Sequence, residues 1–408
     1  MSLHVIVAGG GIGGLALAQG LRRHGVRTTV LERDASSQVR GQGYRLRMDE
    51  HGGAALRTLL PDDLYALYLA TSNRPYMPRG AAFDHQLNEL MRHGRPDRPF
   101  DPDLSHTAVN RMTLRQILLA GLGDAVRFGS EVTGYTEDPD GVRVRLADGG
   151  EITGDLLVGA DGINSAVRAL KLPGDDHIVD TGMRCIYGRL PFDEKNLSWI
   201  PEELFGGSSP VMGPDRTTLA CGVFQPRRPT EEAAADLAPY ADLDPVAPYV
   251  KWTLVAPAES YPVPEAEFWT ASPEQLHAWA VERTRDWHPL LHRLVTEAEP
   301  WATFPLSIRV VRPSPAWAPG RVTLLGDSVH ATTPVGGVGA NTALRDAALL
   351  SGLLAQADRG ERSATGAVAE YETQLRDYGY AAVRGSLVGA HRIFRTPALE
   401  TLIKGAVA

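Results

Sequence analysis

The sequence predicts an α/β fold in which a doubly wound domain with a parallel sheet is joined to a mostly antiparallel β-sheet domain and a C-terminal helix. The first 34 residues have the pattern of a β-α-β unit. Two later segments, 155–168 and 322–357, also have the order of a buried strand, a turn and a helix. Between them, residues 178–300 alternate in hydrophobicity between Pro- and Gly-rich loops, which favours antiparallel strands.

The chain of 408 residues is too long for one hydrophobic core, so we expect two joined domains. The first should be discontinuous and interrupted by the second, and a helical segment should follow both. The expected boundaries are 1–70, 105–177 and 301–360 for the first domain, 71–104 and 178–300 for the second, and 361–408 for the helical segment.

Composition excludes several classes of partner. The net charge is −8 and there is no basic run, so we expect no nucleic-acid partner. No apolar run approaches the ~20 residues of a membrane span, and no signal peptide precedes the first strand, so we expect a cytoplasmic protein without a membrane partner. Cys185 and Cys221 are expected to be free thiols, and the histidines lack metal-ligand spacing, so no metal is expected. Oligomeric state is left open.

Hydrophobic patterning supports the β-α-β unit. Val5–Ala8 is a short apolar run, typical of a central parallel strand buried on both faces. After a glycine cluster, apolar residues from Leu15 to Leu21 recur at helical spacing, and Gly25 ends the helix. Thr28–Leu31 is the second expected strand.

The chain between residues 50 and 160 continues the first domain, with one interruption. We expect short helices over Ala54–Leu59 and Asp62–Ala70. Prolines break up residues 71–105, which should be irregular with one strand near Ala81–Phe83. Further on we expect a helix capped by Thr113, strands over Val126–Leu146 with a hairpin turn at Asp140-Gly141, and a buried strand over Asp155–Ala160.

Later elements follow from the change in pattern after residue 178. We expect strands over Arg184–Leu190, Thr217–Phe224 and Tyr249–Val255, then helices around Pro273–Thr284 and Leu290–Glu297. At Val322–Leu325 the chain returns to a buried strand of the parallel type, and long helices over Asn341–Ala357 and 363–395 follow.

Gly9, Gly11 and Gly14 form the pattern G-x-G-x-x-G between the first strand and the first helix. The first glycine allows a tight turn, the second lets backbone amides approach a pyrophosphate, and the third lets the helix pack on the strand. Glu32 ends the second strand, where an acid can bind a ribose hydroxyl. This Rossmann-type motif predicts a dinucleotide but does not separate FAD from NAD.

Two downstream motifs favour a flavin. The first is the strand Leu156–Ala160 followed by Asp161-Gly162 and a helix with Ser165 and Arg168 near its start. The second is the strand Val322–Leu325 followed by Gly326-Asp327, a glycine loop and a helix from Asn341. A carboxylate suits a ribityl hydroxyl, and a helix N-terminus suits a ring edge that becomes negative on reduction.

In this order and spacing, the three motifs resemble those of the class A FAD-dependent aromatic hydroxylases, of the para-hydroxybenzoate hydroxylase kind. The resemblance covers the chain to about residue 395, although the middle domain matches in its general pattern of strands and loops and not in individual residues. It implies a Rossmann-like FAD-binding domain with an inserted substrate domain. Val338 departs from the Gln that many members carry in the glycine loop. A second dinucleotide motif is absent, as expected for a family in which the nicotinamide cofactor binds transiently.

The resemblance also implies roles for individual residues. Glu32 would bind the adenosine ribose, with Arg33 beside the adenine. Asp327 would bind the ribityl or pyrophosphate part of FAD, and Asp161 lies in a motif associated with both FAD and the nicotinamide cofactor. Arg111 would contact the flavin, and Gly339, Ala340 and Asn341 would lie near its isoalloxazine ring. A mobile arginine near the ring would be Arg40 or Arg47.

The activity implied is that of a monooxygenase from secondary metabolism. NADPH or NADH would reduce FAD, O2 would add to give a flavin hydroperoxide, and one oxygen would pass to an aromatic or polyketide-like small molecule by hydroxylation or epoxidation. The hydroperoxide must be kept from water, so the second domain should supply an apolar wall. Candidates for that wall are Tyr187, Trp199, Phe205, Met212 and Phe224.

Alternatives remain open at this point. An FAD-binding cyclase or scaffold without net redox turnover would carry the same motifs. A plain NAD-dependent dehydrogenase would share the first motif, although the Gly326-Asp327 motif argues against it. No catalytic base is assigned, and His330 either faces the site or packs inside the loop that follows Asp327.

Overall fold

The computed structural model describes residues 3–37, 43–74, 79–94, 108–174, 177–201, 204 and 209–403. Arg40 and Phe205, two residues singled out from the sequence, lie outside these ranges. The helices in chain order are α1 (Ile12–Arg23), α2 (Glu50–Leu59), α3 (Asp62–Thr71), α4 (Arg111–Leu119), α5 (Ala166–Lys171), α6 (Glu194–Leu197), α7 (Thr230–Leu237), α8 (Glu265–Thr270), α9 (Pro273–Arg283), α10 (Pro289–Thr296), α11 (Asp327–His330), α12 (Gly339–Asp358), α13 (Ala364–Phe394) and α14 (Leu399–Leu402).

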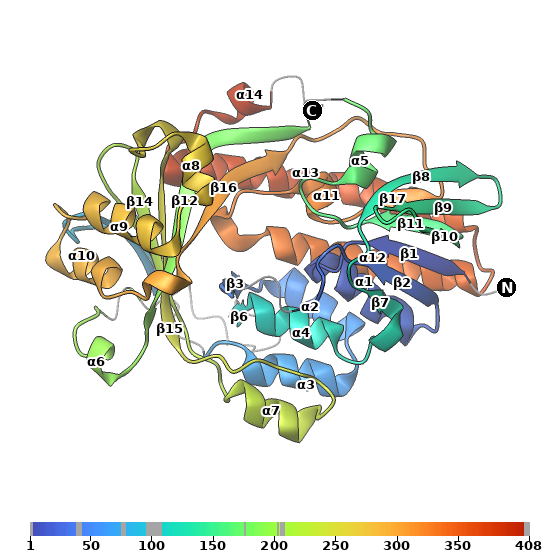
Figure 1. Ribbon diagram of the computed structural model, residues 1–408, viewed down its shortest axis with the longest axis horizontal. Helices are drawn as coiled ribbons and strands as arrows, with labels where there is room; N and C mark the ends of the chain where they lie inside the picture. The colour runs from blue at the N-terminus through green and yellow to red at the C-terminus, as the bar shows by residue number, and fades with distance from the viewer. Residues whose placement is uncertain are drawn as a thin grey trace.

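A five-stranded parallel sheet forms the right-hand part of the molecule (Figure 1). Its strands, in spatial order, are β17 (Val322–Leu324), β11 (Leu156–Gly159), β1 (His4–Ala8), β2 (Arg27–Leu31) and β7 (Val126–Arg127). Every pairing in it is parallel. The three strands predicted from apolar runs are therefore adjacent, although they come from distant parts of the chain.

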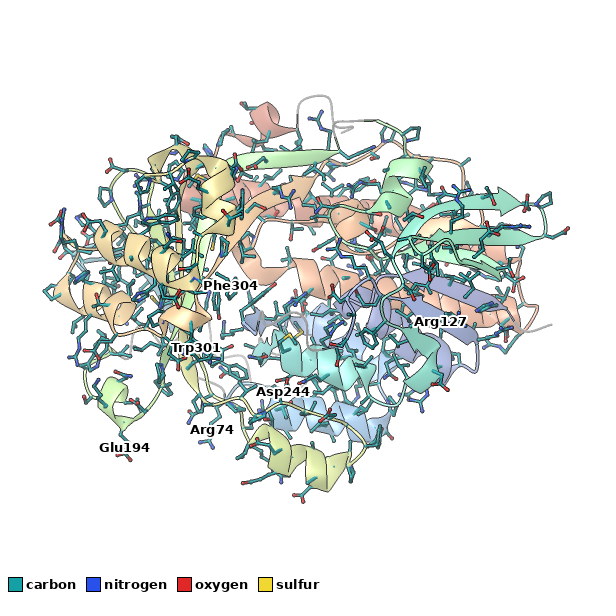
Figure 2. The ribbon with its side chains drawn as sticks, in the orientation of Figure 1. Arg74, Arg127, Glu194, Asp244, Trp301 and Phe304 are labelled. Atoms are coloured by element: carbon teal, nitrogen blue, oxygen red, sulfur yellow. The ribbon has the colours of Figure 1, made fainter. Side chains whose placement is uncertain are left out.

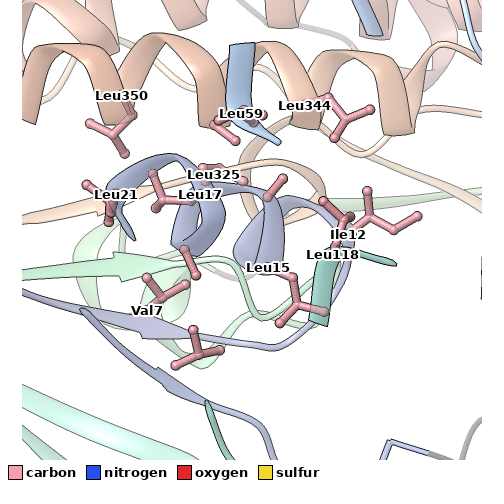
Figure 3. Close-up of a cluster of buried hydrophobic side chains, with 14 of the residues drawn as sticks. Val7, Ile12, Leu15, Leu17, Leu21, Leu59, Leu118, Leu325, Leu344 and Leu350 are labelled. Atoms are coloured by element: carbon pink, nitrogen blue, oxygen red, sulfur yellow. The ribbon is translucent and has the colours of Figure 1, made fainter. Parts of the chain in front are cut away.

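Helix α1 packs between this sheet and α12, as Figure 3 shows. Leu15, Leu17 and Leu21 on α1 are fully buried, with Leu344 and Leu350 of α12 in the same cluster. Each fully buried leucine contributes about 1.5–3 kcal/mol relative to an exposed one. This packing fixes the start of α1, and with it the first glycine motif, against the sheet.

A seven-stranded sheet stands on the other side of the molecule (Figure 1). Its strands, in spatial order, are β16 (Phe304–Val311), β12 (Ile178–Pro191), β15 (Tyr249–Pro257), β14 (Thr218–Phe224), β13 (Ser209–Met212), β4 (Arg79–Asp84) and β5 (Glu89–Gly94). All pairings are antiparallel except β13 with β4. The two sheets confirm the predicted α/β fold with a mostly antiparallel second sheet.

Two smaller sheets complete the fold. The strands β8 (Val132–Asp138), β9 (Gly141–Leu146) and β10 (Glu151–Gly154) form an antiparallel sheet. The predicted hairpin is present, with its turn at Pro139-Asp140, one residue earlier than expected. The ribbon of β3 (Arg45–Arg47) and β6 (Ala108–Asn110) lies between α2 and α4 on one side and the seven-stranded sheet on the other (Figure 1). It links the two halves of the molecule.

Several elements differ from the sequence prediction. Strand β5 and helix α7 were not expected, and β16 extends the second sheet beyond residue 300. The predicted cap at Thr113 is wrong: Asn110 caps α4, because its side chain accepts hydrogen bonds from the amides of Met112 and Thr113 at 2.9 and 3.3 Å. Within the described part of the chain, no helix is long and apolar enough to cross a membrane.

Candidate functional site

The sequence motifs gather at one edge of the parallel sheet. Gly9 follows β1, Glu32 follows β2, Asp161 comes shortly after β11, and Asp327 comes shortly after β17. These four strands are neighbours and parallel, so their carboxyl ends meet. This edge is where open α/β sheets bind ligands.

The three glycines of the first motif have different structural requirements. Gly9 has φ +106°, and a Cβ there would lie 2.4 Å from the carbonyl oxygen of Ala160. A Cβ on Gly14 would lie 2.0 Å from the carbonyl oxygen of Gly9. A Cβ on Gly11 would meet no atom of the described residues within 4 Å. The protein's own packing therefore requires glycine at two positions, whereas Gly11 presents its backbone openly at the start of α1.

The buried carboxylate of Glu32 holds this loop. It accepts a hydrogen bond from the amide of Gly10 at 2.8 Å and another from the amide of Asp34 at 2.9 Å. Arg33 beside it is exposed. The predicted acid thus lies at the glycine loop, where it orients the backbone of that loop.

Arg115 is a site residue to which sequence reasoning assigned no role. Its buried guanidinium donates from Nε to the carbonyl oxygen of Gly10 at 3.0 Å and from Nη1 to that of Ser37 at 2.7 Å. It therefore ties the glycine loop to the segment after β2. The sequence feature that could have pointed to Arg115 is its spacing of four residues from Arg111, which places both side chains on one face of α4.

The Asp161 carboxylate is engaged in helix capping. It accepts hydrogen bonds from the Ser165 hydroxyl at 2.5 Å and from the amides of Ala166 and Val167 at 2.8 and 3.2 Å. The side chain therefore organises the start of α5, and its backbone lies against the loop of Gly9.

Arg168, one turn into α5, joins the second motif to the third. Its Nη1 donates to the carbonyl oxygen of Ser328 at 2.8 Å, and its Nη2 donates to that of Ile163 at 2.7 Å. The Ser328 hydroxyl in turn donates to the carbonyl oxygen of Gly159 at 2.6 Å. Burial lowers the pKa of Arg168, an effect that Asp161 opposes.

Asp327 is exposed to solvent, yet burial by the surrounding protein raises the pKa of its carboxyl group. Solvent exposure and a raised pKa are compatible if the carboxylate is recessed, so that water reaches it while protein atoms surround it. The charges of His330 and Arg111 act in the opposite direction on this pKa. A Cβ on Gly339 would lie 3.8 Å from Oδ1 of Asp327, so the carboxylate adjoins the start of α12.

Asn341 fixes the glycine loop before α12. Its amide nitrogen donates to the carbonyl oxygens of Gly337 and Arg47 at 2.7 and 2.9 Å, and its oxygen accepts from the amide of Asp49 at 3.0 Å. The Asn341 side chain is buried. It acts as a clamp between the loop and the end of β3, while Gly339 and Ala340 beside it are half-buried.

Arg111 faces Tyr44 and the region of Asp327. The centre of its guanidinium lies 5.6 Å from the centroid of the Tyr44 ring. Its Nη1 is buried and has no hydrogen-bond partner among the residues that the structure describes. A buried guanidinium nitrogen without a partner indicates a position prepared for an acceptor on a bound molecule.

His330 packs inside the protein. It is fully buried, and its Nε2 lies 2.7 Å from Oδ2 of Asp346, which also accepts from the amide of Gly326 at 2.8 Å. The hydroxyl of Tyr378 donates to the other Asp346 oxygen at 2.6 Å. Of the two alternatives for His330, the structure therefore supports packing inside the protein and not a position facing the site.

The seven-stranded sheet turns one face toward the β3–β6 ribbon, and we call this the inner face. Tyr187 on this face stacks on Phe304 with 4.7 Å between ring centroids, and Tyr44 lies 5.7 Å from Tyr187. Phe304 lies near the middle of the molecule, as Figure 2 shows. Met212 and Phe224 share this face by strand register.

Trp199 lies apart from these residues. It packs with the cluster beneath α9 and α10, on the opposite side of the sheet, and the Arg293 guanidinium lies 4.3 Å from its ring centroid. Of the proposed wall residues that the structure describes, it alone does not line the inner face.

Comparison with known proteins gives matches along nearly the whole chain. The FAD binding domain family model matches residues 2–49 and 104–386. The chain is 31% identical to the dual O-methyltransferase/FAD-dependent monooxygenase CTB3 of Cercospora beticola, over 96% of this chain and 46% of that protein. The chain therefore spans about half the length of that relative. It is 29% identical to the aurachin C monooxygenase/isomerase of Stigmatella aurantiaca, over 86% of this chain and 80% of that protein.

A solved structure is similar over nearly the whole length of both chains. It belongs to a protein of Photorhabdus luminescens subsp. laumondii TTO1 assigned as an FAD-containing monooxygenase. The TM-score is 0.82 at 30% identity, and the alignment covers 97% of this chain and 99% of that one.

Proposed function

We propose that this chain, which belongs to the FAD binding domain family and is an enzyme of the FAD-dependent monooxygenase family, uses NAD(P)H and O2 to hydroxylate or epoxidise a small aromatic or polyketide-like molecule. One oxygen atom enters the substrate and the other leaves as water, with the nicotinamide cofactor as the electron donor. The proposal rests mainly on one observation: Asp327, Arg111 and the glycine loop lie close together and face the aromatic residues of the inner face.

The residues at the carboxyl edge fit FAD. Gly11 offers open backbone amides for a pyrophosphate, and a Cβ there would occupy the space that a phosphate needs. Arg111 presents a buried nitrogen that has no acceptor among the described residues. The recessed Asp327 carboxylate can accept hydrogen bonds from ribityl hydroxyls. Glu32 would lie at the ribose of the adenosine part.

When bound, FAD would supply hydride acceptance from NAD(P)H and activation of O2. The chain's own residues hold and shield it. Asn341 fixes the loop beside Gly339 and Ala340, where backbone amides at the start of α12 can stabilise developing negative charge. Tyr187 and Phe304 form an apolar aromatic wall that limits the access of water.

The first experiment is the visible spectrum of the purified protein under anaerobic conditions. We expect a flavin spectrum that bleaches on addition of NADPH or NADH, tested with and without 2-naphthoate as an aromatic effector, and that returns with oxygen. Dithionite serves as the control that the bound flavin can be reduced. If dithionite bleaches the flavin but neither NADPH nor NADH does, with or without 2-naphthoate, the result would favour a non-redox cyclase or scaffold instead. A protein without flavin would contradict the proposal.

A further inference from the structure

Lys251 is the third residue of β15, which is the third strand in the order of the seven-stranded sheet, at a position where an apolar residue would be usual. Its neighbours Val250 and Trp252 are fully buried in the cluster beneath α9 and α10, on the side away from the ribbon. Tyr249 points the other way, since its hydroxyl accepts from Nδ2 of Asn110 on β6 at 3.3 Å. Because side chains alternate along a strand, Lys251 is on the inner face with Tyr249.

The Lys251 side chain is partly buried, and its ammonium has no counter-charge among the residues that the structure describes. Its Nζ donates to the Thr253 hydroxyl at 3.3 Å, and no carboxylate among the described residues lies within 4.0 Å of it. The residue opposite on β12 is Arg189, whose own charge is paired with Glu299 at 2.8 Å. The residue opposite on β14 is Gly222, which has no side chain.

The surroundings disfavour an isolated cation at this position. Burial, and then the positive charge of Arg45 on β3, lower the pKa of Lys251 to about 8. The nearby thiols offer no compensation, because burial raises the pKa of Cys185 and of Cys221 to about 12 and keeps both neutral. Arg45 itself has a buried Nε without a hydrogen-bond partner in the described part of the chain. An uncompensated cation in such a place is costly for folding alone.

Aromatic rings stand beside this cation. Tyr187 on β12 is directly opposite Thr253, and it stacks on Phe304. Because Thr253 and Lys251 are two residues apart on one face of β15, Tyr187 is the diagonal neighbour of Lys251, at roughly 7–8 Å between Cα atoms. The inner face thus offers an apolar surface for a ring and a positive charge for an acidic group on it.

We propose that Lys251 is a specificity-determining residue, whose ammonium binds an anionic oxygen, a phenolate, enolate or carboxylate, on an aromatic substrate. The inference rests on the proposed function, because it assigns the inner face to the substrate. Arg45 adds to the positive potential, and Lys251 makes the direct contact. The preferred substrate is therefore an acidic aromatic molecule rather than a neutral one of the same shape.

The test is calorimetric titration of the FAD-loaded protein with 2-naphthoate and with 2-naphthamide, which share their shape and differ in charge. Lys251→Met should weaken naphthoate binding on the order of 10- to 100-fold and leave naphthamide binding within about twofold, since a hydrogen bond to a charged group is lost. Lys251→Arg should retain the preference for naphthoate. The control is Lys195→Met, which removes an exposed lysine on α6 and should change neither affinity.

Two further readouts separate recognition from a structural role. Lys251→Met should melt at the same temperature as the wild type or higher, because it removes a partly buried charge that has no ion-pair partner among the described residues. Wild-type naphthoate affinity should fall about tenfold from pH 7 to pH 9, as an ammonium with pKa about 8 loses its proton. The titratable groups that share the inner face with Lys251 keep their charge state in this range: the pKa of Arg45 is about 10, those of Tyr249 and Cys185 are about 12, and burial raises the pKa of Tyr187 well above its usual value. Cys221, on the opposite side of the sheet, has a pKa of about 12. Lys251→Arg should therefore give a flat profile.

The outcomes are distinguishable from those for the proposed function. A wild type without preference for naphthoate, whether both molecules bind equally or neither binds, overturns the assignment of Lys251. So does a Lys251→Met variant that keeps the preference. Flavin content is measured before the titration: a protein that takes up no FAD and still prefers naphthoate contradicts the proposed function but not the anion site.

Discussion

The guanidinium of Arg168 donates to the carbonyl oxygen of Ser328 at 2.8 Å, although 160 residues separate them in the chain. Through this bond the Asp161-Gly162 motif and the Gly326-Asp327 motif form one structure. The buried Ser328 hydroxyl reinforces it by donating to Gly159 at the end of β11. The position of Asp327 therefore depends on a residue in another motif.

Arg168→Met should lower the unfolding free energy by about 3 kcal/mol, because two charge-assisted hydrogen bonds in a buried setting are lost. Its FAD content after purification should also fall, since Asp327 loses its support. Arg168→Lys should recover only part of either property, because an ammonium cannot reproduce the two diverging contacts. Denaturant titration and flavin absorbance measure both; an unchanged FAD content in Arg168→Met would contradict the coupling.

Gly11→Val should abolish FAD binding without unfolding the protein. Within the described part of the chain, no atom lies within 4 Å of the new Cβ, so the apo forms of variant and wild type should differ by less than about 1 kcal/mol in stability. Gly14→Ala is the matched contrast. Its Cβ would contact the backbone of Gly9, and we expect a loss of about 3 kcal/mol or more. A yellow Gly11→Val protein would rule out the assigned pyrophosphate position.

Asp327→Ala should lose FAD on purification, with Asp286→Ala as an exposed control that keeps it. The pKa of Asp327 is raised in the folded protein, so its ionised form opposes folding above the unfolded pKa of about 3.9. The apo Asp327→Ala protein should therefore be no less stable than the apo wild type at pH 7. Stoichiometric flavin in this variant, measured by absorbance, would contradict the assignment of the Asp327 carboxylate to the cofactor site.

Asp346→Asn should destabilise the protein by about 3–5 kcal/mol near pH 6, since it breaks a fully buried pair with His330. Burial alone would lower the pKa of His330, but the Asp346 carboxylate raises it above its usual value. Stability from the pair is complete below the unfolded pKa of about 6.5 and is lost as pH rises through the folded pKa. The difference between variant and wild type in denaturant titrations should shrink with rising pH; a constant or growing difference would show that His330 is neutral.

The resemblance to class A FAD-dependent aromatic hydroxylases is confirmed by the family and structural matches. The elements predicted best were those whose burial shows in a short window. Val5–Ala8 and Val322–Leu324 lie in the middle and at one end of the parallel sheet, and their apolar runs reveal them. Helix α13 was expected over 363–395 and spans Ala364–Phe394. By contrast, β5 has exposed Leu90 and Met91 at a sheet edge, so no buried pattern marks it.

Site details depended on long-range pairing that no local pattern reveals. Trp199 and Tyr187 are both aromatic and close in sequence, yet they lie on opposite sides of the large sheet. Asn110 and Thr113 are both good capping residues, and the choice between them follows from the end of β6 at Asn110. The role of Arg115 requires that α4 lie beside the loop of Gly10, a tertiary contact between residues 105 positions apart.

Both large sheets acquire an edge strand from the same short stretch of chain. Strand β16 closes one side of the seven-stranded sheet and β17 closes one side of the parallel sheet, and both lie within residues 304–324. On a ribosome that extends the chain from its N-terminus, neither sheet can be completed until this stretch has emerged. We therefore expect the two halves of the molecule to become stable together and late, in a folding step dominated by contacts between distant residues, which is intrinsically slow.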